Sequence, residues 1–299
     1  MIFSFKKGNV YGACLIVFVA VITTLSNTLT HLLPKDFPTE EILFFKVSVG
    51  LCLIVFFHIR HLRKLTQTNM LHWQALKGFA GAVGNWFWIA SIQVLPLADA
   101  TALSLTSAFL TTLGAAYFFS EPMNRWILLA VTIGFTGVFL ILCPSAMIFS
   151  FYAFFPLFSA FALSASSLII KRVSLRDSSN TTVFYLMLFM ALFSAGPAFW
   201  NWQVPEINEL VMLIMIGGLY VLGQFALIEA YTHATAGFVA PFKFTRFPLA
   251  ILSGLLFFGE QMTWKTVLGG GLIIVSYYTI IKAKRLPAYF YTKSNPTIV

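Results

Sequence analysis

The stretch "YFFSEPM" at residues 117–123 returns as "LFFGEQM" at residues 256–262, after an interval of 139 positions. Four of the seven residues are identical, and they include one glutamate in each stretch, Glu121 and Glu260. Each stretch stands at the end of a long apolar run and is followed by another such run. The pattern indicates two similar halves with the same order of apolar segments.

The composition indicates that these apolar runs lie in a membrane. Hydrophobic residues make up 59% of the 299 residues and charged residues only 10%, whereas a soluble domain carries about 25% charged residues. A water-soluble fold could not hide so much apolar surface. Because the runs lack the alternation of an outer-membrane barrel, we predict an all-α integral membrane protein.

Ten apolar runs are long enough to be membrane-spanning helices, since a span needs about 20 apolar residues. The connections between them are short, which leaves no room for a soluble domain. The predicted helices cover residues 9–32, 40–57, 74–94, 97–119, 125–142, 150–170, 182–200, 208–231, 235–258 and 264–281.

The cations in the loops orient these helices. With the N-terminus inside, 14 of the 19 Lys and Arg residues fall on the cytoplasmic side, and only Lys35 and Lys265 fall opposite. The positive-inside bias predicts this split for ten spans with both termini in the cytoplasm. The net charge of +9 then reflects topology and contact with anionic membrane lipid, and it is no sign of nucleic-acid binding.

Each half contains five predicted helices, so the second half enters the membrane in the opposite sense. The first repeat covers residues 9–145 and the second residues 150–285, and a cytoplasmic tail covers residues 286–299. Inverted repeats are typical of secondary transporters, which bind substrate near the middle of the membrane between the halves.

Residues 76–142 and 230–278 resemble the two repeats of the EamA family in the drug/metabolite transporter superfamily. The resemblance rests on small-residue turns before predicted helices four and nine, on Gly-rich helices five and ten, and on Pro241, Glu121 and Glu260. It implies a ten-helix carrier that works by alternating access, in a bacterial cytoplasmic (inner) membrane.

One stretch is similar to a narrower branch of that family. "LKGFAGAVGNWFWIASIQVLPLADATA" at residues 76–102 resembles the S-adenosylmethionine uptake carriers. The resemblance makes this metabolite the leading single substrate candidate.

Lys243 and Arg246 are the strongest candidates for a substrate site. They lie in "VAPFKFTRFPLAI" at residues 239–251, in the middle of predicted helix nine. Each would cost about 2.5–3.5 kcal/mol on a lipid-facing surface, and residues three apart share a helix face. We therefore expect that face to line a hydrated cavity, with local unwinding favoured by Pro241 and Pro248. The alternative is a structural ion pair.

The partner in such an ion pair would be Glu229 or Asp99. Glu229, near the cytoplasmic end of predicted helix eight, could also sense protons or bind a substrate amine, or it could lie in the membrane interface.

The remaining candidates are polar or aromatic residues inside apolar runs, and each has a structural alternative. Those on helices three and eight line a cavity or pack between helices. Asn27 on predicted helix one and Lys46 on predicted helix two are expected to bind substrate. The alternative for Lys46 is that its side chain extends outward to the interface. The candidates are Asn85, Trp86, Trp88, Tyr220, Gln224, Tyr231, Lys46 and Asn27.

A further set is expected to fix helix ends or act in gating. Glu121, Glu260 and Pro241 belong here as family markers. Lys77, at the start of predicted helix three, is expected to be a positive-inside anchor, with a gating role left open.

The sequence contains no arrangement of residues that predicts catalysis, a cofactor, a bound metal or a nucleotide-binding domain. We therefore predict a secondary transporter for a small anionic or zwitterionic metabolite, driven by a coupling ion or a counter-substrate. The alternatives are an exporter of drugs, amino acids or lipid-linked substrates and, outside transport, a membrane scaffold or membrane enzyme. The sequence does not decide the oligomeric state.

Overall fold

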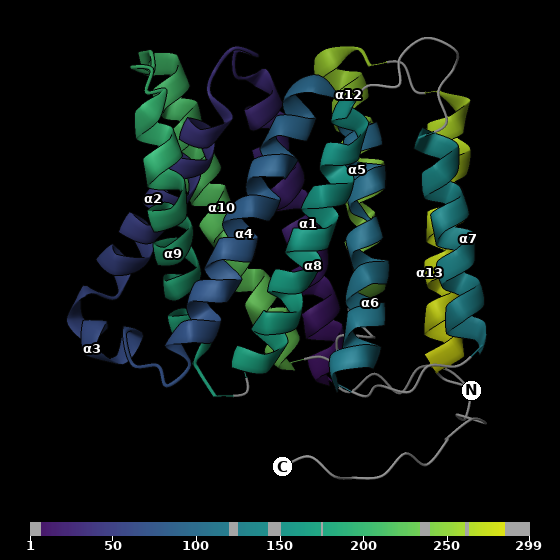
Figure 1. Ribbon diagram of the computed structural model, residues 1–299, viewed down its shortest axis with the longest axis horizontal. Helices are drawn as coiled ribbons and strands as arrows, with labels where there is room; N and C mark the ends of the chain where they lie inside the picture. The colour runs from purple at the N-terminus through teal and green to yellow at the C-terminus, as the bar shows by residue number, and fades with distance from the viewer. Residues whose placement is uncertain are drawn as a thin grey trace.

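The computed structural model is a bundle of helices, and its described residues contain no strand. The structure describes residues 7–119, 125–142, 151–174, 176–233, 240–260 and 263–284. Most helices run roughly side by side along one direction, and α1 begins at the end of the bundle where α13 ends (Figure 1). The elements are α1 (Lys7–Leu32), α2 (Thr39–Phe57), η1 (Ile59–His61), α3 (Leu62–Leu65), α4 (Leu71–Val94), α5 (Leu97–Ser104), α6 (Thr106–Phe119), α7 (Arg125–Leu142), η2 (Phe151–Phe154), α8 (Phe155–Val173), α9 (Ser179–Trp200), α10 (Ile207–His233), η3 (Ala240–Thr245), α12 (Arg246–Phe258) and α13 (Trp264–Lys284).

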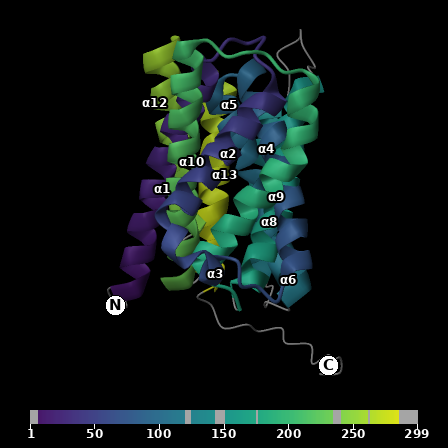
Figure 2. The same cartoon turned by 90° about the vertical axis from the view of Figure 1, so that its left-hand side faces the viewer.

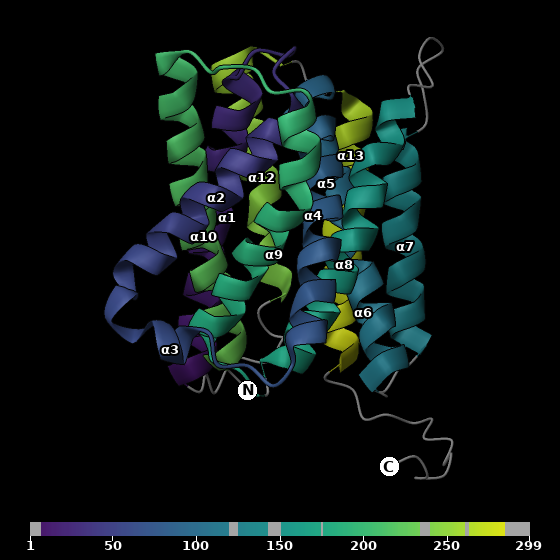
Figure 3. The ribbon, with the colours of Figure 1, turned by 60° about the vertical axis from the view of Figure 1, so that its left-hand side comes forward.

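The packing brings both halves of the chain together. α1 packs against α10 and α12, and α4 packs against α8 and α9. α7 and α13 form a pair at one end of the long axis (Figure 1). The short α3 stands out at the opposite end, as Figure 3 also shows; this end faces the viewer in Figure 2.

The outer surface is strongly apolar, as expected for a helix bundle that faces lipid. The side chains of Phe139, Trp200 and Phe257 are 71%, 88% and 61% exposed. Among the described residues, four apolar stretches are long enough to cross a membrane: Tyr11–Leu32, Phe155–Val173, Ser179–Trp200 and Ile207–Ala230. Shorter apolar stretches lie at Leu97–Thr111, Leu129–Ile141 and Trp264–Ser276. Ten spans therefore remain a prediction, although a helix lies at each predicted position.

Two predicted helices are interrupted, at matching positions in the two halves. The predicted helix 97–119 is divided at Leu105, whose N–H is shared between the carbonyls of Thr101 and Ala102 at 3.2 Å. The predicted helix 235–258 consists, from residue 240, of the 3₁₀ turn η3 and then α12. Residues 234–239 lie outside the described part. Lys243 thus lies in η3 and Arg246 begins α12, which agrees with the unwinding expected near Pro241.

The end of α12 is closed by a glycine in the left-handed conformation. Gly259 has a φ of 60°, which a residue without a Cβ adopts without strain. The N–H of Glu260 then donates to the carbonyl of Gly254 at 3.1 Å, so a main-chain hydrogen bond closes this end of the helix. This turn directs the Glu260 side chain back towards α5.

Candidate functional site

A cavity of about 200 Å³ lies between α1, α4, α8, α10 and the η3–α12 junction. One water molecule needs only about 10–15 Å³, so the cavity has room for more than trapped solvent. Its cationic lining residues are Lys46, Lys243 and Arg246, and the described residues that line it include no Asp or Glu. The described lining of the cavity therefore presents positive charge and no carboxylate.

Arg246 lies at the first turn of α12, above an aromatic ring. Its guanidinium carbon is 5.1 Å from the centre of the Trp88 ring, within the range of a cation–π contact. The Trp88 indole N–H donates to Asn27 Oδ1 at 3.0 Å, which holds the ring in place. The Nε of Arg246 is buried and has no hydrogen-bond partner among the described residues, so the guanidinium retains an unused donor.

Lys46 reaches the cavity from α2. It is buried, and its ammonium donates to Asn85 Oδ1 at 3.1 Å. The ammonium also lies 4.2 Å from the centre of the Tyr220 ring. Asn85 donates in turn to the carbonyl of Gly81 at 2.9 Å and to the Tyr220 hydroxyl at 3.3 Å. The alternative in which Lys46 extends outward to the interface is wrong, because its ammonium ends inside the bundle.

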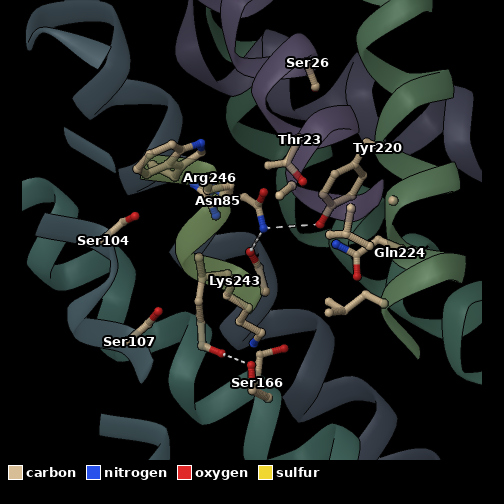
Figure 4. Close-up of a pocket in the computed structure, with 18 of the residues that line it drawn as sticks. Thr23, Ser26, Asn85, Ser104, Ser107, Ser166, Tyr220, Gln224, Lys243 and Arg246 are labelled. Atoms are coloured by element: carbon tan, nitrogen blue, oxygen red, sulfur yellow. Dashed lines mark hydrogen bonds between the residues drawn. The ribbon is translucent and has the colours of Figure 1, made fainter. Parts of the chain in front are cut away.

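Lys243 occupies another part of the cavity wall. Figure 4 shows it extending towards the side that carries Ser166, whereas Arg246 lies with Asn85. The cavity is also rich in hydroxyl groups, which the sequence analysis did not identify. The hydroxyl-bearing lining residues, apart from Tyr220, are Thr23, Ser26, Ser104, Ser107, Thr111, Ser166 and Ser167.

Of the residues proposed from sequence for substrate binding, eight line this cavity: Lys243, Arg246, Lys46, Asn27, Asn85, Trp88, Tyr220 and Gln224. Trp86 does not line it. Its indole N–H donates to Glu40 Oε1 at 2.9 Å, and it packs against Phe87 and Phe155. Successive residues are about 100° apart around a helix, so Trp86 points to a different side of α4 from Asn85, which lines the cavity.

Glu229 also lies outside the cavity lining. Its Oε1 is 3.4 Å from Nδ1 of His233, one turn further along α10. The side chain of Tyr231 is outside the described part of the chain.

Among the residues predicted to fix helix ends, Glu260 lies in the described part of the chain. Glu260 accepts from the N–H of Leu97, the first residue of α5, at 3.1 and 3.0 Å through its two carboxylate oxygens. Glu121 and the side chain of Pro241 lie outside the described residues.

The prediction of Lys77 as an interfacial anchor is wrong. Its side chain is 0% exposed. The ammonium donates to the carbonyl of Thr182 at 2.7 Å and to Gln74. The local sequence suggested an anchor because Lys77 stands at the start of an apolar run, but α4 begins earlier, at Leu71, and carries the lysine into the bundle.

The cavity lining repeats the interval seen in the sequence. Six pairs of lining residues are 139 positions apart, the interval that separates Glu121 from Glu260. Each pair joins corresponding helices of the two halves. The pairs are Asn27 and Ser166, Gly81 and Tyr220, Asn85 and Gln224, Trp88 and Leu227, Ser104 and Lys243, and Ser107 and Arg246. Applied to Lys243, Arg246 and Asn27, the same interval identifies three of the serines that the sequence analysis missed.

Comparison with known families decides the class of protein. The model of the EamA-like transporter family matches residues 10–143 and again residues 150–282. The chain belongs to the EamA-like transporter family. This EamA transporter is an integral membrane protein and not an enzyme. Among its described residues, no group of His, Cys, Asp and Glu is arranged to hold a metal ion.

Curated relatives of this EamA transporter have different substrates. It is 29% identical to a riboflavin transporter of Vibrio cholerae, over 91% of this chain and 93% of the relative. It is 30% identical to the pseudopaline exporter CntI of Pseudomonas aeruginosa, over 92% and 97%. It is 22% identical to an S-adenosylmethionine uptake transporter of Rickettsia prowazekii, over 93% and 95%.

A crystal structure of a protein with only 14% sequence identity has the same fold. It matches 95% of this chain and 100% of its own length with a TM-score of 0.68. At this identity the likeness concerns the fold alone.

Proposed function

We propose that this EamA transporter is a secondary carrier that moves a small metabolite with at least one anionic group by alternating access. The observation that carries the proposal is the charge of the cavity. Lys46, Lys243 and Arg246 line it, and its described lining contains no carboxylate. The Nε–H of Arg246 is buried and has no hydrogen-bond partner among the described residues. An unsatisfied buried donor is costly, so an anionic ligand that accepts from it would offset that cost.

Arg246 is the residue we assign to capture of the anion. Its planar group suits bidentate binding of a carboxylate or phosphate. Its Nε–H has no partner among the described residues, and the ring of Trp88 supports the guanidinium on one face. Lys46 is held by Asn85, so it adds a hydrogen-bond donor at a fixed position beside the anion.

The positive lining of the cavity favours some substrates over others. S-Adenosylmethionine has one carboxylate but carries a net positive charge from its sulfonium and ammonium groups. The rings of Trp88 and Tyr220, which could hold a sulfonium, already face Arg246 and Lys46. We therefore place net-anionic carboxylates and phosphorylated metabolites ahead of S-adenosylmethionine, and ahead of riboflavin, which is uncharged. Among the relatives, the exporter at 30% identity favours efflux as the alternative direction of transport.

We further propose the architecture predicted from the sequence, ten spans in two inverted five-helix repeats. The repeats cover residues 9–145 and 150–285, and the tail at 286–299 and the N-terminus lie in the cytoplasm of a bacterial cell. The two separate family matches and the paired lining residues support two repeats. Reporter fusions after residues 205 and 290 should appear on opposite sides of the membrane, and reporters on one side would contradict the inversion.

The substrate class is tested with purified protein and a panel of charged probes. The panel contains phosphate, di- and tricarboxylates, phosphorylated sugars, S-adenosylmethionine and riboflavin. A ligand at 100 times its dissociation constant stabilises the folded state by about 2.7 kcal/mol, which thermal unfolding can detect. The probes that stabilise the protein are then followed as labelled solutes in proteoliposomes. We expect net-anionic probes to stabilise and to be transported, and stabilisation by cations or neutral probes alone would refute the charge argument.

Variants locate the effect in the cavity. In Arg246→Gln, loss of charge-assisted hydrogen bonds of about 1.5–3 kcal/mol should weaken anion binding by roughly 10- to 150-fold. Arg63→Gln, which removes an exposed arginine on α3, is the matched control and should bind normally. The exchange Ser107→Arg with Arg246→Ser moves the arginine to the paired position and should restore part of the binding.

A further inference from the structure

The last turn of α1 carries a histidine whose two ring nitrogens both face acceptors. Nδ1 of His31 contacts the carbonyl oxygen of Ile92 on α4. Nε2 lies 3.6 Å from Oε1 of Glu260. The edge of the imidazole also meets the ring of Phe258, with the ring centres 4.3 Å apart. The histidine is therefore enclosed by α4, by the end of α12 and by the turn that follows it.

The protonation state of His31 decides how many of these contacts are favourable. A neutral imidazole has one N–H and one acceptor nitrogen, whereas the imidazolium has two N–H donors. Only the imidazolium can donate to the carbonyl of Ile92 and also meet the carboxylate of Glu260 with a donor. After loss of the proton, one ring nitrogen faces an oxygen with lone pair against lone pair.

Glu260 extends this contact to a third helix. Its carboxylate also accepts from the N–H of Leu97, which begins α5. A second tie between α1 and α12 lies one turn below, where the hydroxyls of Thr28 and Ser253 are 2.5 Å apart. His31 and Glu260 together thus hold α1, α5 and α12 at one end of the bundle.

The same three helices carry cavity residues further along their length. Asn27 is on α1, Ser104 is on α5 and Arg246 is at the start of α12. α12 has 13 residues, so its rise of about 1.5 Å per residue sets Arg246 roughly 20 Å from the end that Glu260 follows. His31 is therefore connected to the cavity along three helices.

We propose that His31 is the binding site of the coupling proton, with Glu260 as its partner. Protonated His31 holds α1, α5 and α12 together and keeps this end of the cavity closed. Release of the proton separates them and opens it. The inference rests on the proposed transport function, and it supplies the energy source that the function requires.

Other charged groups near this end are engaged elsewhere or face solvent. Asp99, in the first turn of α5, accepts from the hydroxyl of Thr266 on α13. Lys35 and Asp36, on the loop after α1, are exposed. α4 offers His31 only the carbonyl of Ile92, and α12 offers the ring of Phe258. The side chains of His31 and Glu260 are 11% and 16% exposed, which leaves a route for the proton.

The test measures opening directly and needs no substrate. Spin labels are placed at Lys35→Cys and Phe257→Cys, two exposed positions beside this end of α1 and α12, in protein whose own cysteines are replaced by serine. The distance distribution is recorded in nanodiscs at pH 5.5 and pH 8.5. We expect a shift towards longer distances at high pH in the labelled wild type, and loss of that shift in His31→Gln and in Glu260→Gln.

A matched pair in the same chain provides the control. His233 and Glu229 also form a His–Glu contact, at 3.4 Å, but on one helix and away from His31. His233→Gln should keep the pH-dependent shift. A wild type whose distances ignore pH, or a His31→Gln protein that still responds, would overturn the proposal. Neither result depends on anion binding, so failure of the proposed substrate class is distinguishable from failure of this inference.

Discussion

Gly254 and Glu260 should be energetically coupled, and a double-mutant cycle can detect the coupling. A Cβ at position 254 would lie 2.5 Å from Oε2 of Glu260, and the three nearest atoms to it all belong to this side chain. The carboxylate is held there by the N–H of Leu97. Gly254→Ala therefore has one main steric consequence, which is displacement of the carboxylate from the start of α5.

The expected change in unfolding free energy is the sum of two opposing contributions. Loss of an N-terminal helix cap costs about 0.5–2 kcal/mol, whereas alanine in place of glycine inside α12 stabilises by about 0.5–1 kcal/mol. In the wild-type background the net effect of Gly254→Ala then lies between a stabilisation of about 0.5 kcal/mol and a destabilisation of about 1.5 kcal/mol. In a Glu260→Ala background the cap is already absent, so Gly254→Ala should stabilise by about 0.5–1 kcal/mol. The coupling energy should equal the value of the cap.

The assay is thermal unfolding of the four proteins of the cycle in the same detergent, followed by tryptophan fluorescence. Gly218→Ala is the control, because the only atom near its added Cβ is 3.9 Å away, and it should act alike in both backgrounds. If Gly254→Ala shifts the midpoint by the same amount with and without Glu260, the carboxylate does not lie where the structure places it.

Two further variants test buried contacts. Lys77→Met should destabilise the protein by about 1–3 kcal/mol, because the carbonyl of Thr182 loses a buried donor. Thermal unfolding measures this loss of stability, and an unchanged midpoint would show that Lys77 does not stabilise the bundle from within. Trp88→Phe should lower stability by about 0.5–1.5 kcal/mol through loss of the hydrogen bond to Asn27. It should leave anion-dependent stabilisation largely intact, since a ring still lies beneath Arg246. If Trp88→Phe lowers the unfolding stability and the anion-dependent stabilisation equally, the hydrogen bond of Trp88 does not act on stability alone.

The apolar runs of the sequence predicted the positions of the helices, because length and hydropathy are local properties. The gathering of Lys243, Arg246 and Asn85 was also predictable. Charges and amides inside apolar runs have few places to lie except an internal cavity. The division at Leu105 was not predictable, since no proline or glycine marks it and a shared N–H produces it.

The errors concern side-chain direction, which depends on how each helix is rotated against its neighbours. Trp86 and Trp88 were equivalent in the sequence, yet one faces Glu40 and the other faces Arg246. Lys77 stands near a helix end, where an anchor at the interface is expected, and for Lys46 extension to the interface is one of two alternatives. Tertiary contacts with Asn85 and Thr182 hold them inside. Such partners come from distant segments and leave no local pattern.

The pairing of Ser104 with Lys243 and of Ser107 with Arg246 has a consequence for the resting state. If the two halves exchange shapes as proposed, identical halves would give inward- and outward-open forms that are related by a two-fold rotation and have equal free energy. The carrier would then spend half its time in each. In these two pairs the cations belong to the second half and the hydroxyls to the first, so the two forms differ in free energy. A difference of about 1.4 kcal/mol would populate one form tenfold over the other. The cavity of the empty carrier should therefore be open mainly to one side of the membrane. An anion bound to Arg246 would change the ratio of the two forms.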